Sequence, residues 1–169
     1  KGYMKDHVIG VDIGTTGTKT GIYDGDGRLK GEAFEESILR YPRPGQVEQD
    51  PEEIFQSVLR TVKAAMAQAD LAPDRIAAIA LDGQMAGLMA VDENWQPVTH
   101  YDSWLDTRCA PWLEQLRPHE QDIIKTCGMA LAFHHAPKIL YWRDQPEVWR
   151  RIASFVQPAG FVSGRLAGL

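Results

Sequence analysis

Cysteine is scarce in this sequence, and long apolar runs are absent. The two cysteines, Cys109 and Cys127, form no CxxC pair and are too few to staple a secreted scaffold. No apolar run approaches the length of a membrane-spanning helix, and the segment Lys1–His7 lacks the apolar core of a signal peptide. These absences predict free thiols in a reducing compartment. We therefore expect a cytoplasmic protein with no membrane partner.

Basic clusters are absent as well. The chain has 18 basic and 23 acidic residues, a formal net charge of -5, and its basic residues are scattered. Nucleic-acid-binding domains usually present a clustered basic face, so no nucleic-acid partner is expected. With 169 residues, 44% of them hydrophobic and 24% charged, the chain has the composition of a globular domain with its own core.

Three β-strands are predicted close together near the start of the chain, at Val8–Asp12, Lys19–Asp24 and Arg28–Ile38. Turns rich in glycine separate them. The connections are too short for helical crossovers, so these strands are expected to form an antiparallel meander.

A helix is predicted to begin at Asp50, which can cap it. Pro51 suits the first helical position, and Glu52 and Glu53 favour the positive end of the helix dipole. Apolar residues then follow a helical period to near Asp70. The preceding segment, Leu39–Gln49, contains two prolines and is predicted to be a loop.

The second half of the chain alternates between strand and helix patterns. Ile76–Leu81 is a continuous apolar run that suits a buried strand. Other extended segments are predicted at Ala86–Val91, Val98–Trp104 and Ser154–Val156. Helices are predicted at Thr107–Leu116, Glu120–Cys127, Pro137–Arg143, Glu147–Ile152 and Phe161–Arg165. This order predicts an α/β or α+β protein with one sheet covered by helices. Core packing is expected for Trp104 and Trp112.

The turn Asp12–Lys19 has the composition of a phosphate-binding loop. Its glycines allow backbone N–H groups to converge on an anion, and its threonines add hydroxyl donors. Asp12 could hold Mg²⁺ through water, and Lys19 adds positive charge. Unlike a Walker P-loop, the turn is followed by a strand. From these residues alone, a plain hairpin is an equally good interpretation.

Two further groups of polar residues leave alternatives open. Asp82 follows a predicted strand and could either join the phosphate site or cap its own turn. The pair His134-His135 suggests metal binding, but adjacent side chains point apart and no i, i+4 partner follows. A loop or surface role is the favoured interpretation of these histidines.

The segment DIGTTGTK at Asp12–Lys19 resembles the first phosphate motif of the actin-like ATPase superfamily. Further segments resemble the FGGY carbohydrate kinases, in that family's order. Asp82–Gly87 (DGQMAG) is close to the GQMHG form of xylulose kinases, and Ser103–Arg108 (SWLDTR) resembles the family's W-x-D-x-R segment. The remaining similar segments are Tyr41–Pro51, Ala136–Trp149 and Gln157–Gly168.

The resemblance implies a ribonuclease-H-like fold with a mixed sheet, an antiparallel three-strand start and flanking helices. It implies transfer of the ATP γ-phosphoryl group to a sugar or polyol hydroxyl, with ATP and Mg²⁺ as cofactors. The residues implied to face the phosphates and Mg²⁺ are Asp12, Gly14, Thr15, Thr16 and Lys19. Those implied to line or border the sugar site are Gln84, Met85, Ala86, Asp106, Arg108 and Phe133.

The sequence departs from the family pattern in two ways. Ala86 stands where the xylulose-kinase form has histidine, which puts xylulose itself in doubt because hydroxyl recognition governs sugar selectivity. Residues 1–169 also correspond to part of the family's first domain. The catalytic aspartate and the adenine site are expected outside this chain, so the isolated chain is expected to be inactive. A regulatory sugar-binding module, another actin-like ATPase and a homodimer remain open alternatives.

Overall fold

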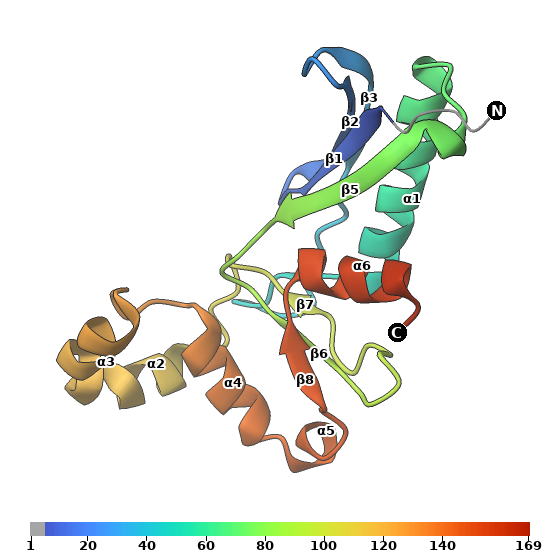
Figure 1. Ribbon diagram of the computed structural model, residues 1–169. Helices are drawn as coiled ribbons and strands as arrows, with labels where there is room; N and C mark the ends of the chain where they lie inside the picture. Colours follow the sequence, from blue (N-terminus) through green and yellow to red (C-terminus); the bar gives the residue numbers. More distant parts are fainter. Residues whose placement is uncertain (1–5) are drawn as a thin grey trace. The chain divides into compact units, whose positions relative to one another are not determined.

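The computed structural model describes residues 6–169 (Figure 1), which divide into two compact units. Unit 1 comprises the chain up to Ile38, Glu52–Gln84 and Pro158–Ala167. Unit 2 comprises Leu39–Pro51, Met85–Gln157 and Gly168–Leu169. The predicted α/β class is confirmed, and each unit is described separately below.

Unit 1 is built on a four-stranded sheet with the order β3-β2-β1-β5. The strands are β1 (His7–Ile13), β2 (Gly17–Asp24), β3 (Leu29–Glu36) and β5 (Ile76–Gly83). The first three pair antiparallel, which confirms the predicted meander, and β5 pairs parallel with β1. The sheet is therefore mixed, as the resemblance implied.

Helix α1 (Pro51–Gln68) runs along one face of this sheet, as Figure 1 shows. Along β1, alternate residues from His7 to Ile13 are buried, as expected for a strand covered on one face. Two hydroxyl pairs link the helix to β2: Thr18 with Ser57 at 2.7 Å, and Thr20 donating to Thr61 at 2.8 Å. Buried polar groups are thus satisfied within this layer.

Helix α6 (Pro158–Ala167) completes unit 1 by packing on the start of α1. The Arg165 guanidinium lies 4.7 Å from the centre of the Phe55 ring and 3.3 Å from the Glu52 carboxylate. Phe161 and Val162 are fully buried. The helix is longer than the predicted Phe161–Arg165 because Pro158 can occupy its first position, where no backbone N–H is needed.

The opposite face of the unit 1 sheet is open. Val8, Asp12 and Lys19 all lie on it and are exposed. Strand β5 is exposed along Ala77–Ala80, and Ile79 is 45% exposed. The prediction of a buried strand at Ile76–Leu81 is therefore right about the strand and wrong about its burial, because β5 is an edge strand of the described sheet.

Unit 2 contains two small antiparallel pairs. Strand β4 (Glu48–Gln49) pairs with β7 (Tyr101–Asp102), and β6 (Met89–Val91) pairs with β8 (Ser154–Val156). The prediction of a loop across Leu39–Gln49 is wrong at its end, because the partner of β4 lies about fifty residues later and leaves no local pattern.

The helices of unit 2 are α2 (Ala110–Leu116), α3 (Glu120–Cys127), α4 (His135–Arg143) and α5 (Pro146–Trp149). Short 3₁₀ turns occur at Pro73–Arg75 in unit 1 and at Arg117–His119 in unit 2. Helix α5 begins one residue earlier than the predicted helix Glu147–Ile152 and ends three residues earlier. Rings of Trp112, Tyr141 and Trp142 pack edge to face, whereas Trp104 is 50% exposed, contrary to its predicted core position. Within residues 6–169, no helix is both long enough and apolar enough to span a membrane.

Candidate functional site

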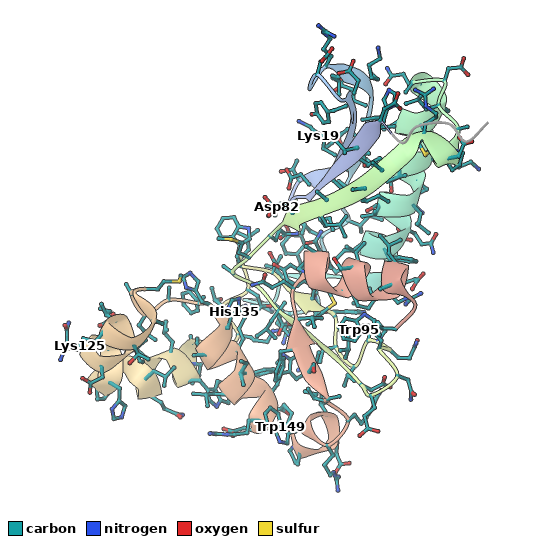
Figure 2. The ribbon with its side chains drawn as sticks, in the orientation of Figure 1. Lys19, Asp82, Trp95, Lys125, His135 and Trp149 are labelled. Atoms are coloured by element: carbon teal, nitrogen blue, oxygen red, sulfur yellow. The ribbon has the colours of Figure 1, made fainter. Side chains whose placement is uncertain are left out.

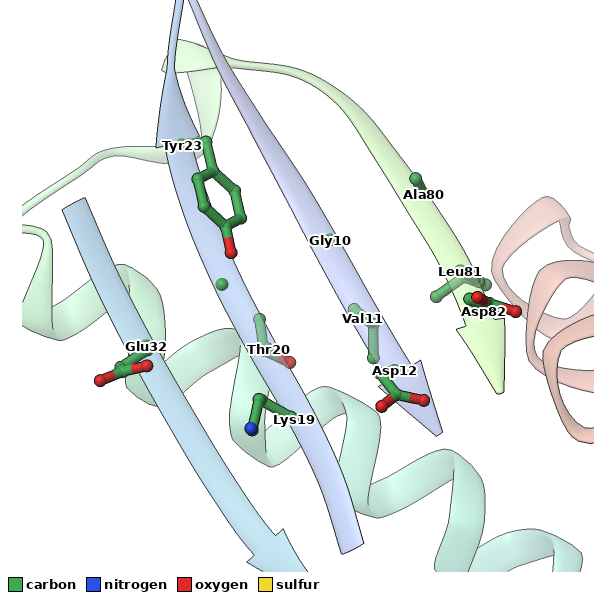
Figure 3. Close-up of a pocket in the computed structure, with 11 residues that line it drawn as sticks. Gly10, Val11, Asp12, Lys19, Thr20, Tyr23, Glu32, Ala80, Leu81 and Asp82 are labelled. Carbon is green, nitrogen blue, oxygen red and sulfur yellow. The ribbon is translucent and has the colours of Figure 1, made fainter. Parts of the chain in front are cut away.

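Three charged side chains form a row across the open face of the unit 1 sheet. Asp12 on β1 is paired in register with Lys19 on β2 and with Asp82 on β5. Neighbouring strands lie about 4.8 Å apart, so the three side chains are close neighbours on one face. Figure 3 shows them lining one pocket of about 300 Å³. The structure thus places Asp82 beside the predicted phosphate residues.

Two glycines form part of the floor of this pocket, where they place no side chain above the sheet. Gly10 and Gly21 face each other across β1 and β2, and both line the pocket. A Cβ at position 21 would lie 2.9 Å from the Tyr23 ring, so Gly21 allows that ring to lie over the strand. At Gly10, by contrast, an added Cβ would have its nearest neighbour 4.0 Å away, so this glycine leaves room above the sheet next to the charged row.

The turn between β1 and β2 is held in a fixed shape by its own hydrogen bonds. The N–H of Gly14 donates to the Gly17 carbonyl at 3.0 Å, and the Ser37 N–H donates to the Thr16 carbonyl at 2.9 Å. Neither Gly14 nor Gly17 has a positive φ. Gly17 is needed instead for close approach, since a Cβ there would lie 2.4 Å from the Glu35 carbonyl oxygen.

Gln84 fastens this turn to the end of β5. Its amide oxygen accepts a hydrogen bond from the Thr15 hydroxyl at 3.0 Å, and its amide nitrogen donates to the Gly14 carbonyl at 3.3 Å. The Gln84 N–H donates to the Ile13 carbonyl at 3.1 Å. Gln84, which the resemblance implies to be a sugar residue, is thus a structural partner of the phosphate turn in unit 1.

Unit 2 contains a larger cavity of about 500 Å³. Its walls are mainly apolar, with contributions from Ile123, Cys127, Met129, Ala130, Leu131 and Ala132. Met85 and Ala86, both implied to be sugar residues, line it together with His134, His135 and Gln157. Phe133, although it lies between lining residues in the chain, does not line the cavity itself.

The polar end of this cavity consists of three atoms in mutual contact. His135 Nε2 lies 2.6 Å from the Met85 carbonyl oxygen. Gln157 Nε2 lies 2.7 Å from the same oxygen and 3.1 Å from His135 Nε2. His135 is labelled in Figure 2, at the first residue of α4. The sequence interpretation of the histidine pair missed this role, because the partners of His135 lie 22 and 50 residues away.

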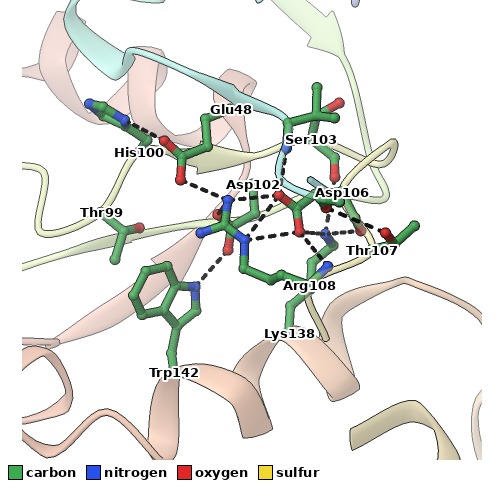
Figure 4. A network of polar contacts seen from close by, with 12 residues as sticks. Glu48, Thr99, His100, Asp102, Ser103, Asp106, Thr107, Arg108, Lys138 and Trp142 are labelled. Carbon is green, nitrogen blue, oxygen red and sulfur yellow. Dashed lines mark hydrogen bonds and ion pairs between the residues drawn. The ribbon is translucent and has the colours of Figure 1, made fainter. Parts of the chain in front are cut away.

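Asp106 and Arg108 lie in a separate, buried network of charges in unit 2 (Figure 4). Arg108 Nη2 contacts Asp106 Oδ2 and Glu48 Oε1, both at 2.7 Å, and Asp102 Oδ1 at 3.5 Å. Asp106 also accepts a hydrogen bond from the Val47 N–H at 2.7 Å. Neither Asp106 nor Arg108 lines the cavity; both are engaged with the network.

Lys138 supplies the second cation of the network. Its ammonium group is fully buried and donates to the carbonyls of Ser103 and Asp106, each at 3.0 Å. Burial lowers the pKa of Lys138, and the neighbouring carboxylates of Asp102 and Asp106 oppose that shift. Apart from the place of Lys138 in the APK segment, no local pattern in the sequence pointed to this residue.

The carboxylates of the network differ in their titration. Burial raises the pKa of Asp102 to about 6, although Arg108 and the Trp142 N–H, which donates at 2.6 Å, act in the opposite direction. Burial would also raise the pKa of Glu48, but hydrogen bonds from His100 and Arg108 outweigh it and lower that pKa. Of these two carboxylates, Asp102 is the one whose charged form is disfavoured in the folded protein.

No preformed metal cage is found in the part of the chain that the structure describes, since no group of three or more His, Cys, Asp or Glu side chains there could hold an ion. Asp12 and Asp82 nevertheless form a carboxylate pair beside the pocket of unit 1. Mg²⁺ is commonly held by one or two carboxylates, by water and by the phosphates of its nucleotide. The donor set therefore fits Mg²⁺ that arrives with a nucleotide.

Comparison with known protein families gives one match that covers nearly the whole chain. Residues 7–169 match the N-terminal domain of the FGGY family of carbohydrate kinases. A glycerol kinase from Trichormus variabilis is 32% identical over 139 residues, which is 80% of this chain and 28% of that protein. A xylulose kinase from Bacillus subtilis is 29% identical over 168 residues, 96% of this chain and 33% of that protein.

Solved structures agree on the fold. A gluconate kinase from Lactobacillus acidophilus superposes with a TM-score of 0.86 at 24% identity, covering 94% of this chain and 32% of that one. A xylulose kinase from Rhodospirillum rubrum gives a TM-score of 0.86 at 21% identity, covering 94% of this chain and 33% of that one. The chain thus spans about a third or less of the length of the relatives it matches.

Proposed function

Since the chain belongs to the FGGY family of carbohydrate kinases, we propose that it forms the N-terminal part of an enzyme that transfers the ATP γ-phosphoryl group to a sugar or polyol hydroxyl. The observation that carries the proposal is the row of Asp12, Lys19 and Asp82 above the glycine floor, beside the fastened turn. Phosphoryl transfer depends mainly on positioning the reactants and on stabilising the charge of the phosphates. The three charged side chains of this row can contribute to both.

Each member of the row has a role in this proposal. Lys19 attracts the phosphate oxygens as a point charge. Asp12 would hold Mg²⁺ through water, with Asp82 as a second carboxylate beside it. A bound Mg²⁺ would supply charge neutralisation at the phosphates. The hydroxyls of Thr15 and Thr16 and the backbone at Gly14 border the phosphates.

The acceptor side of the proposal rests on unit 2. Met85 and Ala86 line its cavity, whose volume of about 500 Å³ is in the usual range for small-molecule sites. Asp106 and Arg108 stabilise the loops beside the acceptor, and Phe133 borders it. An acceptor other than xylulose is proposed because Ala86 offers no side-chain hydrogen bond. Ala86→His should shift the ranking of acceptors, and an unchanged ranking would count against contact at this position.

The metal role is tested by Asp12→Asn in the kinase-active polypeptide that carries these residues. We expect a loss of kcat/KM of about 100-fold or more, because an electrostatic partner of the transition state is removed. Asp26→Asn is the matched control, since Asp26 lies in an exposed turn of unit 1. Equal activity of the two variants would overturn the assignment of Asp12.

Residues 1–169 alone are proposed to lack turnover, because the catalytic base and the adenine site are assigned to further polypeptide. A coupled assay of ADP release tests this directly. Sugar-dependent ADP release by the isolated chain would refute it. That the protein forms a homodimer and that it is located in the cytoplasm are further predictions.

A further inference from the structure

The three-atom contact at the polar end of the unit 2 cavity gathers two nitrogens around one carbonyl oxygen. The Met85 carbonyl oxygen can only accept. If His135 Nε2 and Gln157 Nε2 both donate to it, at 2.6 and 2.7 Å, they face each other as two donors at 3.1 Å. If His135 Nε2 instead accepts from Gln157, two acceptors face each other at 2.6 Å.

The mismatch does not depend on how the hydrogens are assigned. Exchanging the oxygen and nitrogen of the Gln157 amide, a common ambiguity, only moves the conflict to the contact with Met85. A favourable contact needs one donor and one acceptor. When three groups all touch one another, at least two of them must be of the same kind. One of the three contacts therefore always joins two like groups.

A hydroxyl group removes this conflict. It donates one hydrogen bond and accepts two. Met85 offers one acceptor, and His135 and Gln157 can offer two N–H donors directed toward the same point. A hydroxyl that separates these groups would donate to the carbonyl and accept from both nitrogens, so that three complementary hydrogen bonds replace the contact between like groups.

We propose that His135 and Gln157, with the Met85 carbonyl, recognise one hydroxyl of the acceptor and so determine its specificity. This inference rests on the proposed function. The cavity surroundings support it, because the remaining walls are largely apolar and offer few competing partners. A small number of polar groups in an apolar site usually fixes the orientation of a ligand.

The cluster also accounts for the departure at position 86. Alanine there supplies no side-chain donor, but His135 brings an imidazole to the same cavity from the start of α4. The donor therefore approaches the acceptor from a different wall. We expect the cluster to recognise a different hydroxyl of the acceptor from the one that a histidine at position 86 would contact.

The test measures affinity on the 169-residue chain by ligand-observed NMR. The probes are D-xylulose, D-ribulose, xylitol and glycerol, with 1-deoxy-D-xylulose as an analogue that lacks one hydroxyl. The variants are His135→Phe and Gln157→Leu, which keep bulk and remove the polar atoms. His119→Phe is the matched control, because His119 is an exposed histidine of the 3₁₀ turn Arg117–His119 and does not line the cavity. Thermal melting establishes that each variant is folded.

The expected result is a loss of about 5- to 10-fold in affinity for at least one hydroxylated probe in each of the two variants, with no loss in His119→Phe. A probe without the recognised hydroxyl should bind parent and variants alike. Equal losses for all probes, or none, would overturn the inference and leave the proposed function standing. If no polyol binds to the parent, the inference also fails, and Mg·ATP binding that still depends on Asp12 would show that the phosphate half of the proposal survives.

Discussion

Asp102 makes the stability of unit 2 depend on pH in a direction opposite to that of most carboxylates. Its side chain is 1% exposed, its Oδ2 accepts from the Trp142 N–H at 2.6 Å, and its Oδ1 finds no hydrogen-bond donor among the described residues. Arg108 Nη2, at 3.5 Å from Oδ1, gives a charge interaction only. Burial of this half-satisfied carboxylate raises its pKa from 3.8 to about 6.

The magnitude follows from that rise. A change in pKa of this size corresponds to about 3 kcal/mol between the two protonation states. Because the folded-state pKa is above the unfolded one, the folded state binds the proton more tightly. The stabilising contribution is complete below the unfolded value of 3.8 and is lost as the pH rises through about 6.

The assay compares urea unfolding of the parent and of Asp102→Asn at a series of pH values. Asparagine keeps the size of the side chain and cannot ionise. The free energy of unfolding of the variant, relative to the parent, should therefore rise by about 2.4 kcal/mol between about pH 4 and about pH 7. Subtracting the parent's free energy of unfolding from that of the variant at each pH cancels the contributions of other titrating groups. One of these is Glu48, whose lowered pKa stabilises the protein at higher pH.

Asp122→Asn is the control, since Asp122 lies on α3 with a side chain that is 82% exposed. Its difference from the parent should not vary with pH. A flat difference for Asp102→Asn as well would refute the reasoning, because it would mean that Asp102 titrates alike in the folded and unfolded states.

Three further substitutions separate buried from exposed interactions. Lys138→Met should lower the free energy of unfolding by about 3–5 kcal/mol, because a buried cation with two carbonyl partners is removed; a loss below about 1 kcal/mol in urea unfolding would contradict this. Gly31→Ala should cost about 1–3 kcal/mol, since its Cβ would lie 2.4 Å from the Ala65 carbonyl oxygen of α1; an unchanged urea midpoint would refute the clash. Arg60→Ala should leave the midpoint unchanged, because its ion pairs with Glu35 and Glu53 are exposed to solvent, and a clear shift would contradict that interpretation.

Local patterns were sufficient for much of the fold. The meander of β1, β2 and β3 follows from short connections and glycine turns, and α1 begins at Pro51 as its capping signals indicate. The errors concern neighbours that are distant in sequence. Strand β4 exists only through its pairing with β7, and the exposure of β5 depends on which strands flank it.

The site residues divide in the same way. Asp12 and Lys19 could be predicted as phosphate residues because the chemistry of their turn is continuous in sequence, and the structure pairs them in register on neighbouring strands. The cluster of Met85, His135 and Gln157 was not, because its members come from three separated segments and include a backbone carbonyl. The burial of Arg108 could not be predicted from the sequence either. It depends on three carboxylates that surround the side chain in the folded unit.

The buried network and the hydroxyl-recognising cluster are physically connected through α4. Lys138 lies one helical turn after His135, and its ammonium group is bonded to the carbonyls of Ser103 and Asp106. Those bonds fix the first turn of α4, and therefore the position of His135, against the loop that carries Asp106 and Arg108. In the proposed function, Asp106 and Arg108 would therefore affect the acceptor site by positioning its loops, since neither residue lines the cavity. Lys138→Met should then weaken polyol affinity even under conditions where the chain remains folded, whereas Arg60→Ala should not.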